Sequence, residues 1–174
     1  MDLKEKVRII ENFPIPGISF KDITPLLSDP DVYLETIRQL DILVDTLNEK
    51  PDVIVAPESR GFLFGVPLAL KRGIGFVPVR KPGKLPCAVI SEEYKLEYGT
   101  NKIEVHADAI SKGDKVLIVD DLIATGGTLE ATAKLIEKMG GNIIGIVAVI
   151  ELTEVGGIEK LKKYRPKALI SYPY

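Results

Sequence analysis

The chain has 174 residues, of which 45% are hydrophobic and 28% are charged, and its formal net charge is −2. This size and balance predict one globular domain, residues 1–174, and leave no basic excess to support nucleic-acid binding. A single cysteine and a single histidine exclude an internal disulfide, a cysteine-rich zinc site and a multi-histidine metal centre.

The first residues, Met1 to Glu11, mix charged and apolar side chains in a pattern that predicts an amphipathic helix. The next segment, Asn12 to Leu27, contains three prolines and is not expected to be helical. The longest apolar stretch, Ile143 to Ile150, is far shorter than the roughly 20 residues of a spanning helix, and no signal peptide is apparent. We therefore expect a cytoplasmic protein without a membrane partner.

Short apolar runs rich in β-branched residues recur along the chain and predict buried strands. These runs are Val53–Ala56, Gly75–Val79, Val116–Val119, Ile143–Ile150 and Ala168–Ser171. They are continuous rather than alternating with polar residues, which is typical of a parallel sheet that is covered on both faces.

Helical patterns lie between these runs. Ser28 or Asp29 is a candidate N-cap for a helix whose apolar face runs from Leu34 to Leu47. Further helices are predicted over Gly61–Lys71 and Thr128–Met139. The alternation predicts an α/β fold with a central, mainly parallel sheet flanked by helices.

A long segment without helical or strand periodicity, residues 80–101, interrupts this alternation. Its later part, Ala88–Ile90, is predicted to form a hairpin with Lys102–Val105. Long irregular segments in compact domains usually serve function, so we expect a flexible loop beside a binding site.

The stretch Val116 to Thr128 is the most informative part of the sequence. A buried strand leads to two carboxylates, Asp120 and Asp121, and then through small residues into a helix. Gly126 and Gly127 allow backbone N–H groups to approach an anion closely, and the helix N-terminus adds partial positive charge. The carboxylates would repel a phosphate, so they need hydroxyl groups or Mg²⁺ as partners. Phosphate at one end and hydroxyls at the other describe a ribose 5-phosphate.

This stretch has neither the Gly-Lys-Ser/Thr of a Walker A loop nor a dinucleotide-binding glycine pattern. It closely resembles the 5-phosphoribosyl-1-pyrophosphate (PRPP) signature of the type I phosphoribosyltransferases. Four more segments resemble the branch of that family that uses adenine, and the resemblance covers essentially the whole chain. These segments are Pro16–Pro25, Glu58–Phe62, Pro78–Pro86 and Leu96–Gly99.

The resemblance implies the type I phosphoribosyltransferase fold, with an N-terminal hood (residues 1–30), the flexible catalytic loop and a homodimer. It also implies conversion of adenine and PRPP into AMP and pyrophosphate. Mg²⁺ would be carried by PRPP, and no protein residue is assigned with certainty as its ligand. By similarity, the 5-phosphate would lie against Ala124, Thr125, Gly126, Gly127 and Thr128, and the ribose hydroxyls against Asp120 and Asp121.

Pyrophosphate binding is assigned by resemblance to two segments. The first is Glu58, Ser59, Arg60 and Gly61, for which the family predicts a cis peptide between Glu58 and Ser59. The second supplies the cations Arg80, Lys81 and Lys84. Arg60 and Arg80 are expected to be catalytic, because cations near the leaving pyrophosphate stabilise the developing negative charge.

Adenine recognition is assigned by resemblance to Ser19, Phe20 and Lys21, with Leu122 on the other face of the base. Lys21 departs from the arginine that many relatives carry. Tyr98 and Glu97 belong to the lid, which excludes water from the reacting centre. Glu97 is a candidate catalytic residue, either as the base at adenine N9 or as a partner for the cations.

Without the resemblance, the residues alone are compatible with other functions. A transferase for hypoxanthine, guanine, xanthine or orotate is one, although a lysine near the base is expected for a 6-oxopurine and none follows the signature before Lys134. A PRPP-sensing regulator that binds RNA or DNA is another, but it needs a basic patch or an added domain. A plain nucleotide-binding module would leave the long loops unexplained.

Overall fold

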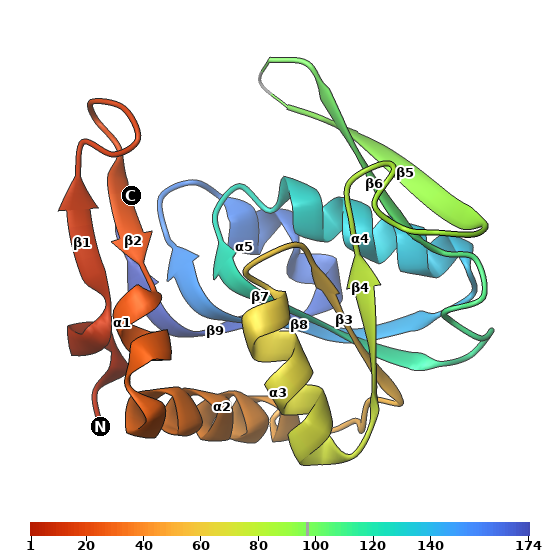
Figure 1. Cartoon of the computed structure of the whole chain (residues 1–174), viewed down its shortest axis with the longest axis horizontal. Coiled ribbons are helices and arrows are strands. Elements are labelled where there is room, and N and C mark those ends of the chain that lie inside the picture. Colours follow the sequence, from red (N-terminus) through yellow and green to blue (C-terminus); the bar gives the residue numbers. More distant parts are fainter. Residues whose placement is uncertain (97) are drawn as a thin grey trace.

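The computed structural model describes residues 1–96 and 98–174. Its centre is a five-stranded parallel sheet with the strand order β4-β3-β7-β8-β9 (Figure 1). The strands are β3 (Val53–Pro57), β4 (Gly75–Val79), β7 (Lys115–Ile123), β8 (Asn142–Leu152) and β9 (Pro166–Tyr172). Each contains one of the five predicted apolar runs, so the predicted α/β class with a central parallel sheet is confirmed.

Helices cover both faces of this sheet (Figure 1). One face packs on α2 (Pro30–Asp45) and α3 (Phe62–Arg72), and the other on α4 (Gly127–Lys138), α5 (Gly157–Lys160) and η2 (Lys162–Tyr164). Strand β7 serves both layers, because Leu117 packs on the α2–α3 side and Ile118 on the α4 side. This explains the continuous apolar runs in the sequence. None of the described helices is long and apolar enough to cross a membrane.

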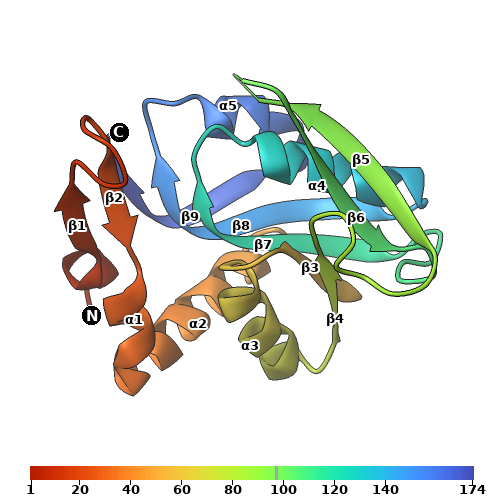
Figure 2. The ribbon, with the colours of Figure 1, turned by 45° about the horizontal axis from the view of Figure 1, so that its top comes forward.

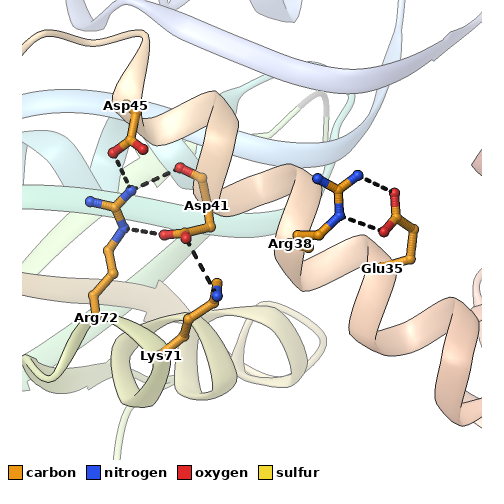
Figure 3. A network of polar contacts seen from close by, with 6 residues as sticks. All are labelled: Glu35, Arg38, Asp41, Asp45, Lys71 and Arg72. Atoms are coloured by element: carbon orange, nitrogen blue, oxygen red, sulfur yellow. Dashed lines mark hydrogen bonds and ion pairs between the residues drawn. The ribbon is translucent and has the colours of Figure 1, made fainter.

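Helix α2 begins as the sequence predicts, with Asp29 as the N-cap: its carboxylate accepts hydrogen bonds from the N–H groups of Asp31 and Val32. Its apolar face is narrower than predicted. Leu34 is 70% exposed because it lies outside the buried arc, and Leu47 follows the end of the helix. Charged side chains fix α3 beside α2, through Arg72 of α3 with Asp41 and Asp45 of α2 (Figure 3).

The N-terminal segment differs from its prediction. The helix expected over Met1–Glu11 is wrong beyond a short 3₁₀ turn, η1 (Leu3–Lys6), because β1 (Arg8–Glu11) pairs antiparallel with β2 (Ser19–Asp22). Asn12–Leu27 is also not free of helix, since α1 (Thr24–Ser28) begins with Pro25 in its first turn. Tertiary pairing with β2 overrides the local helical pattern here.

The predicted hairpin is confirmed and is longer than expected. Strands β5 (Val89–Lys95) and β6 (Thr100–His106) pair antiparallel along their full length. Figures 1 and 2 show this hairpin lying along α4, where Lys138 forms an ion pair with Glu92 of β5. At its base, Arg80 and Glu104 exchange backbone hydrogen bonds, which tie the segment after β4 to β6.

Candidate active site

The predicted site segments meet at the carboxyl-terminal edge of the sheet. Glu58–Gly61 follows β3, Arg80–Lys84 follows β4 and Ala124–Gly126 follows β7, and these three strands are neighbours. Open α/β sheets bind their ligands at this edge. Segments that are far apart in the sequence therefore come together because of the order of the strands.

The loop after β7 lines a cleft of about 120 Å³ together with Asp120, Leu122 and the first turn of α4. Gly126 adopts φ +80° before α4 begins at Gly127, so the backbone turns sharply at the helix N-terminus. The loop is supported from behind by α5, where a Cβ on Gly157 would lie 2.0 Å from the carbonyl oxygen of Ala124. Backbone N–H groups at a helix N-terminus and a small cleft suit a phosphate group.

The two acidic residues lie within β7 rather than after it. The strand continues to Ile123, four residues beyond the predicted end at Val119. Asp120 Oδ1 accepts a hydrogen bond from the N–H of Asp121 at 2.8 Å. Burial, then the nearby Asp121 charge, raises the pKa of Asp120 well above its usual value. Burial also raises the pKa of Asp121, whereas the Arg60 cation lowers it.

Arg60 connects two parts of the predicted site. Its Nε lies 2.9 Å from Oδ2 of Asp121, and its guanidinium carbon lies 5.5 Å from the ring centre of Phe20. A cation at this distance from an aromatic ring is attracted to the ring face. The predicted ribose residue, pyrophosphate residue and base residue are thus in contact.

The segment that carries Arg60 packs very closely on β7. The predicted cis peptide between Glu58 and Ser59 is confirmed. A Cβ on Gly61 would lie 2.8 Å from the carbonyl oxygen of Pro57 and 2.9 Å from Oδ1 of Asp120. Such contacts are too short for a side chain, so only glycine allows this approach.

The predicted cation segment is held by two glutamates. Glu58 Oε1 accepts the N–H of Lys81 at 2.7 Å and lies 3.3 Å from Arg80 Nε. Glu104, which is buried, accepts the N–H of Gly83. The side chains of Lys81 and Lys84 are exposed. Glu104 was not among the residues predicted from the sequence, because its contact depends on how β6 pairs with the segment after β4.

The predicted adenine residues lie on two elements. Ser19, Phe20 and Lys21 lie in β2, where Phe20 also packs edge-on against Phe13 with ring centres 5.2 Å apart. Leu122 lies in β7 and lines the cleft of the phosphate loop. Arg60 links Phe20 to β7 through Asp121.

The structure covers only part of the predicted lid, because Glu97 lies outside the described residues. Tyr98 is 88% exposed and lines a cleft with Thr125 and Thr128. Tyr94 of β5 was not predicted from the sequence, and its hydroxyl is 2.9 Å from the hydroxyl of Thr128. The hairpin therefore contacts the phosphate loop directly, and no local sequence signal marks this contact.

Comparison with known proteins agrees with this geometry. The family described as "Phosphoribosyl transferase domain" matches residues 23–170. An adenine phosphoribosyltransferase from Methanococcus maripaludis is 55% identical over 172 residues, which cover 99% of each chain. The chain belongs to the adenine phosphoribosyltransferase family. The resemblance described from the sequence is confirmed.

Solved structures of the family share the fold over nearly the whole chain. Adenine phosphoribosyltransferase from Thermoanaerobacter pseudethanolicus is 51% identical with a TM-score of 0.92, covering 98% of both chains. The Saccharomyces cerevisiae adenine phosphoribosyltransferase is 41% identical with a TM-score of 0.92, covering 97% of this chain and 96% of that one. The yeast protein was solved with adenine and an imino-altritol bisphosphate. The predicted type I phosphoribosyltransferase fold is therefore confirmed.

Proposed function

We propose that the chain transfers the 5-phosphoribosyl group from PRPP to adenine, giving AMP and pyrophosphate in purine salvage. The observation that carries this proposal is the position of Arg60, which contacts Phe20 on one side and Asp121 on the other. Base, ribose and leaving group must meet at ribose C1, and Arg60 lies between the residues assigned to the base and to the ribose. Membership of the adenine phosphoribosyltransferase family supports the same reaction.

The 5-phosphate binds, in this proposal, to the loop from Ala124 to Thr128. The supporting features are the cleft that this loop lines and the N-terminus of α4, where backbone N–H groups are free of intrahelical partners. Asp120 and Asp121 then accept hydrogen bonds from the ribose hydroxyls. Two neighbouring carboxylates repel a further anion, so they favour neutral donors such as hydroxyls.

The pyrophosphate binds between Glu58–Gly61 and the cations Arg80, Lys81 and Lys84. Glu58 positions the cation segment, because it accepts the N–H of Lys81 and pairs with Arg80. Negative charge grows on pyrophosphate as its bond to C1 breaks, so Arg60 and Arg80 stabilise the transition state more than the ground state.

Mg²⁺ enters with PRPP in this proposal. Within the described residues, no group of three or more His, Cys, Asp or Glu side chains is placed to hold a metal ion. Asp121 already pairs with Arg60, and Asp120 accepts a backbone N–H. A metal ion that arrives with PRPP would neutralise part of the diphosphate charge.

Adenine stacks on Phe20, with Leu122 on its other face. A backbone carbonyl and an N–H near Ser19 and Lys21 pair with the 6-amino group and N1 of adenine. Hypoxanthine carries an oxygen at position 6 and a proton on N1, so it places an acceptor and a donor where adenine has the opposite groups.

Residues 80–101 act as the lid in this proposal, and Tyr98 and Glu97 belong to it by resemblance. Residues 1–30 form the hood over the base, within one domain of residues 1–174. We further propose a cytoplasmic homodimer with no nucleic-acid or membrane partner. An apolar stripe of Leu63, Val66 and Leu70 is exposed along α3 and supports a second copy as partner.

The proposal is tested by incubating the protein with PRPP, Mg²⁺ and each of adenine, hypoxanthine, guanine and xanthine, and measuring pyrophosphate release. We expect release with adenine and less than about a hundredth of that rate with the 6-oxopurines. Asp121→Asn is expected to lower kcat/KM for PRPP strongly. Phe20→Ala is expected to raise the adenine KM more than the PRPP KM. Absence of turnover with adenine overturns the proposal.

A further inference from the structure

The last strand ends beside the hood. Tyr172, the final residue of β9, is buried, and the ladder between β8 and β9 fixes its backbone opposite Leu152. Its hydroxyl donates a hydrogen bond to the carbonyl oxygen of Lys4 at 2.8 Å. Figure 1 shows the C-terminus of the chain beside β2. Tyr172 therefore joins the central sheet to the N-terminal segment.

A buried lysine lies over the ring of Tyr172. Lys21 is only 7% exposed, and its Nζ is 5.7 Å from the centre of that ring. The same Nζ donates hydrogen bonds to Ser19 Oγ at 2.8 Å and to the Ser19 carbonyl oxygen at 2.9 Å. Among the described residues, no carboxylate pairs with Lys21 within 4.0 Å.

A buried ammonium group without a carboxylate partner needs other compensation. The two oxygens of Ser19 and the negative face of the Tyr172 ring supply it. The ring thus keeps the Lys21 side chain folded back on Ser19. A carbonyl oxygen has two acceptor positions, so the Ser19 carbonyl still has one available for a ligand donor.

We infer that Tyr172 is a positioning residue for base recognition, which acts through the Lys21 ammonium to fix the Ser19 backbone that reads the edge of adenine. This inference rests on the proposed function, and it adds a residue from the opposite end of the chain. The residues assigned to PRPP follow β3, β4 and β7, so loss of Tyr172 affects adenine binding and leaves PRPP binding intact.

Steady-state kinetics of four variants test the inference. Tyr172→Leu removes the ring and the hydroxyl, and Tyr172→Phe removes only the hydroxyl. Lys21→Met removes the ammonium group and its hydrogen bonds to Ser19 while keeping a similar side-chain length. We expect Tyr172→Leu and Lys21→Met each to raise the adenine KM about tenfold, with the PRPP KM within about twofold of wild type. Tyr172→Phe retains the ring face, so its adenine KM stays within about threefold. The double variant Tyr172→Leu/Lys21→Met is expected to raise the adenine KM no further than Lys21→Met alone, because Tyr172 acts on Ser19 only through the Lys21 ammonium.

Tyr164→Leu is the matched control. Tyr164 is also buried, lies under a lysine (Lys163 Nζ, 4.8 Å from the ring centre) and donates a hydrogen bond from its hydroxyl to Glu137 at 3.1 Å. It packs on the α4 side, away from the hood. We expect Tyr164→Leu to lower the unfolding midpoint as Tyr172→Leu does while leaving the adenine KM unchanged.

The outcomes separate the inference from the proposed function. Absence of AMP formation by the wild type overturns both. Normal turnover by the wild type, with an unchanged adenine KM in Lys21→Met or with adenine and PRPP KM values that rise together in Tyr172→Leu, overturns the inference alone. Should Tyr172→Leu fail to fold, Lys21→Met and Tyr172→Phe still decide between these outcomes.

Discussion

The Nε of Arg60 lies 2.9 Å from Oδ2 of Asp121, a carboxylate that is only 6% exposed. The same guanidinium lies over Phe20. The partner of a buried carboxylate matters more than that of a surface one, because water does not replace it. Arg60 thus does two things in the proposed site: it pairs with the buried carboxylate of Asp121 and it presents a cation to the leaving pyrophosphate.

Arg60→Gln removes this cation and is expected to lower kcat/KM for PRPP about a hundredfold. It also removes the charge that most lowers the pKa of Asp121, so the raising effect of burial is opposed less and the pKa rises further. The acid limb of the pH profile of kcat/KM therefore moves to higher pH. Arg38→Gln, which breaks an exposed pair with Glu35, is the control and leaves the profile in place. An unshifted acid limb in Arg60→Gln contradicts the pairing.

Asp120→Asn is expected to stabilise the fold at neutral pH by about 0.5–2 kcal/mol, while reducing PRPP use. Burial and the charge of Asp121 raise the pKa of Asp120 above its ordinary value of 3.8. Just above pH 3.8 the unfolded chain therefore loses the proton of this carboxyl group, whereas the folded chain still holds it. The folded state then binds more protons, and stability falls as pH rises from about 3.8 toward the folded pKa. The asparagine oxygen still accepts the N–H of Asp121.

Urea unfolding of both proteins as a function of pH measures this effect. The stability gain of Asp120→Asn should be present at neutral pH and disappear in acid below 3.8, where the aspartate is protonated in both states. A constant gain at all pH values would show that it comes from packing rather than from charge.

Sequence patterns succeeded where the signal is local. The five apolar runs became the five strands of the central sheet, and Asp29 capped α2. The N-terminal prediction failed because the antiparallel pairing of β1 with β2 decided the conformation of Arg8–Glu11. A short segment with mixed charged and apolar residues fits a strand as well as a helix, and only its partner settles the choice.

The residues of the candidate site differ in the same respect, because some are marked by local sequence and others depend on distant contacts. Residues within one motif, such as Asp120 to Thr128, were marked by their types and order. Tyr94, Glu104 and Gly157 were missed, because each acts on a segment that is distant in sequence. A single sequence carries no record of such contacts, so neither spacing nor propensity would have found them.

Gly61→Ala is expected to destabilise the protein by roughly 1–3 kcal/mol, because the added methyl group meets the Pro57 carbonyl oxygen at 2.8 Å and Asp120 at 2.9 Å. Pro57 precedes the Glu58–Gly61 segment, so its displacement should also move Arg60 and lower kcat/KM for PRPP. Gly75→Ala is the matched control, since its nearest contact would be Val53 at 3.8 Å. Equal unfolding midpoints for the two variants would contradict the close packing at Gly61.

Gly157→Ala tests whether α5 supports the phosphate loop. The added methyl group would lie 2.0 Å from the Ala124 carbonyl oxygen, so the loop or α5 must move. A shift of Ala124 changes the backbone that lines the phosphate cleft, whereas Ser19, Phe20 and Lys21 lie on β2. We therefore expect the PRPP KM to rise about tenfold while the adenine KM stays within about twofold. Steady-state kinetics with each substrate varied in turn, beside the same Gly75→Ala control, measures this split. Reduced stability with an unchanged PRPP KM would limit Gly157 to a role in folding.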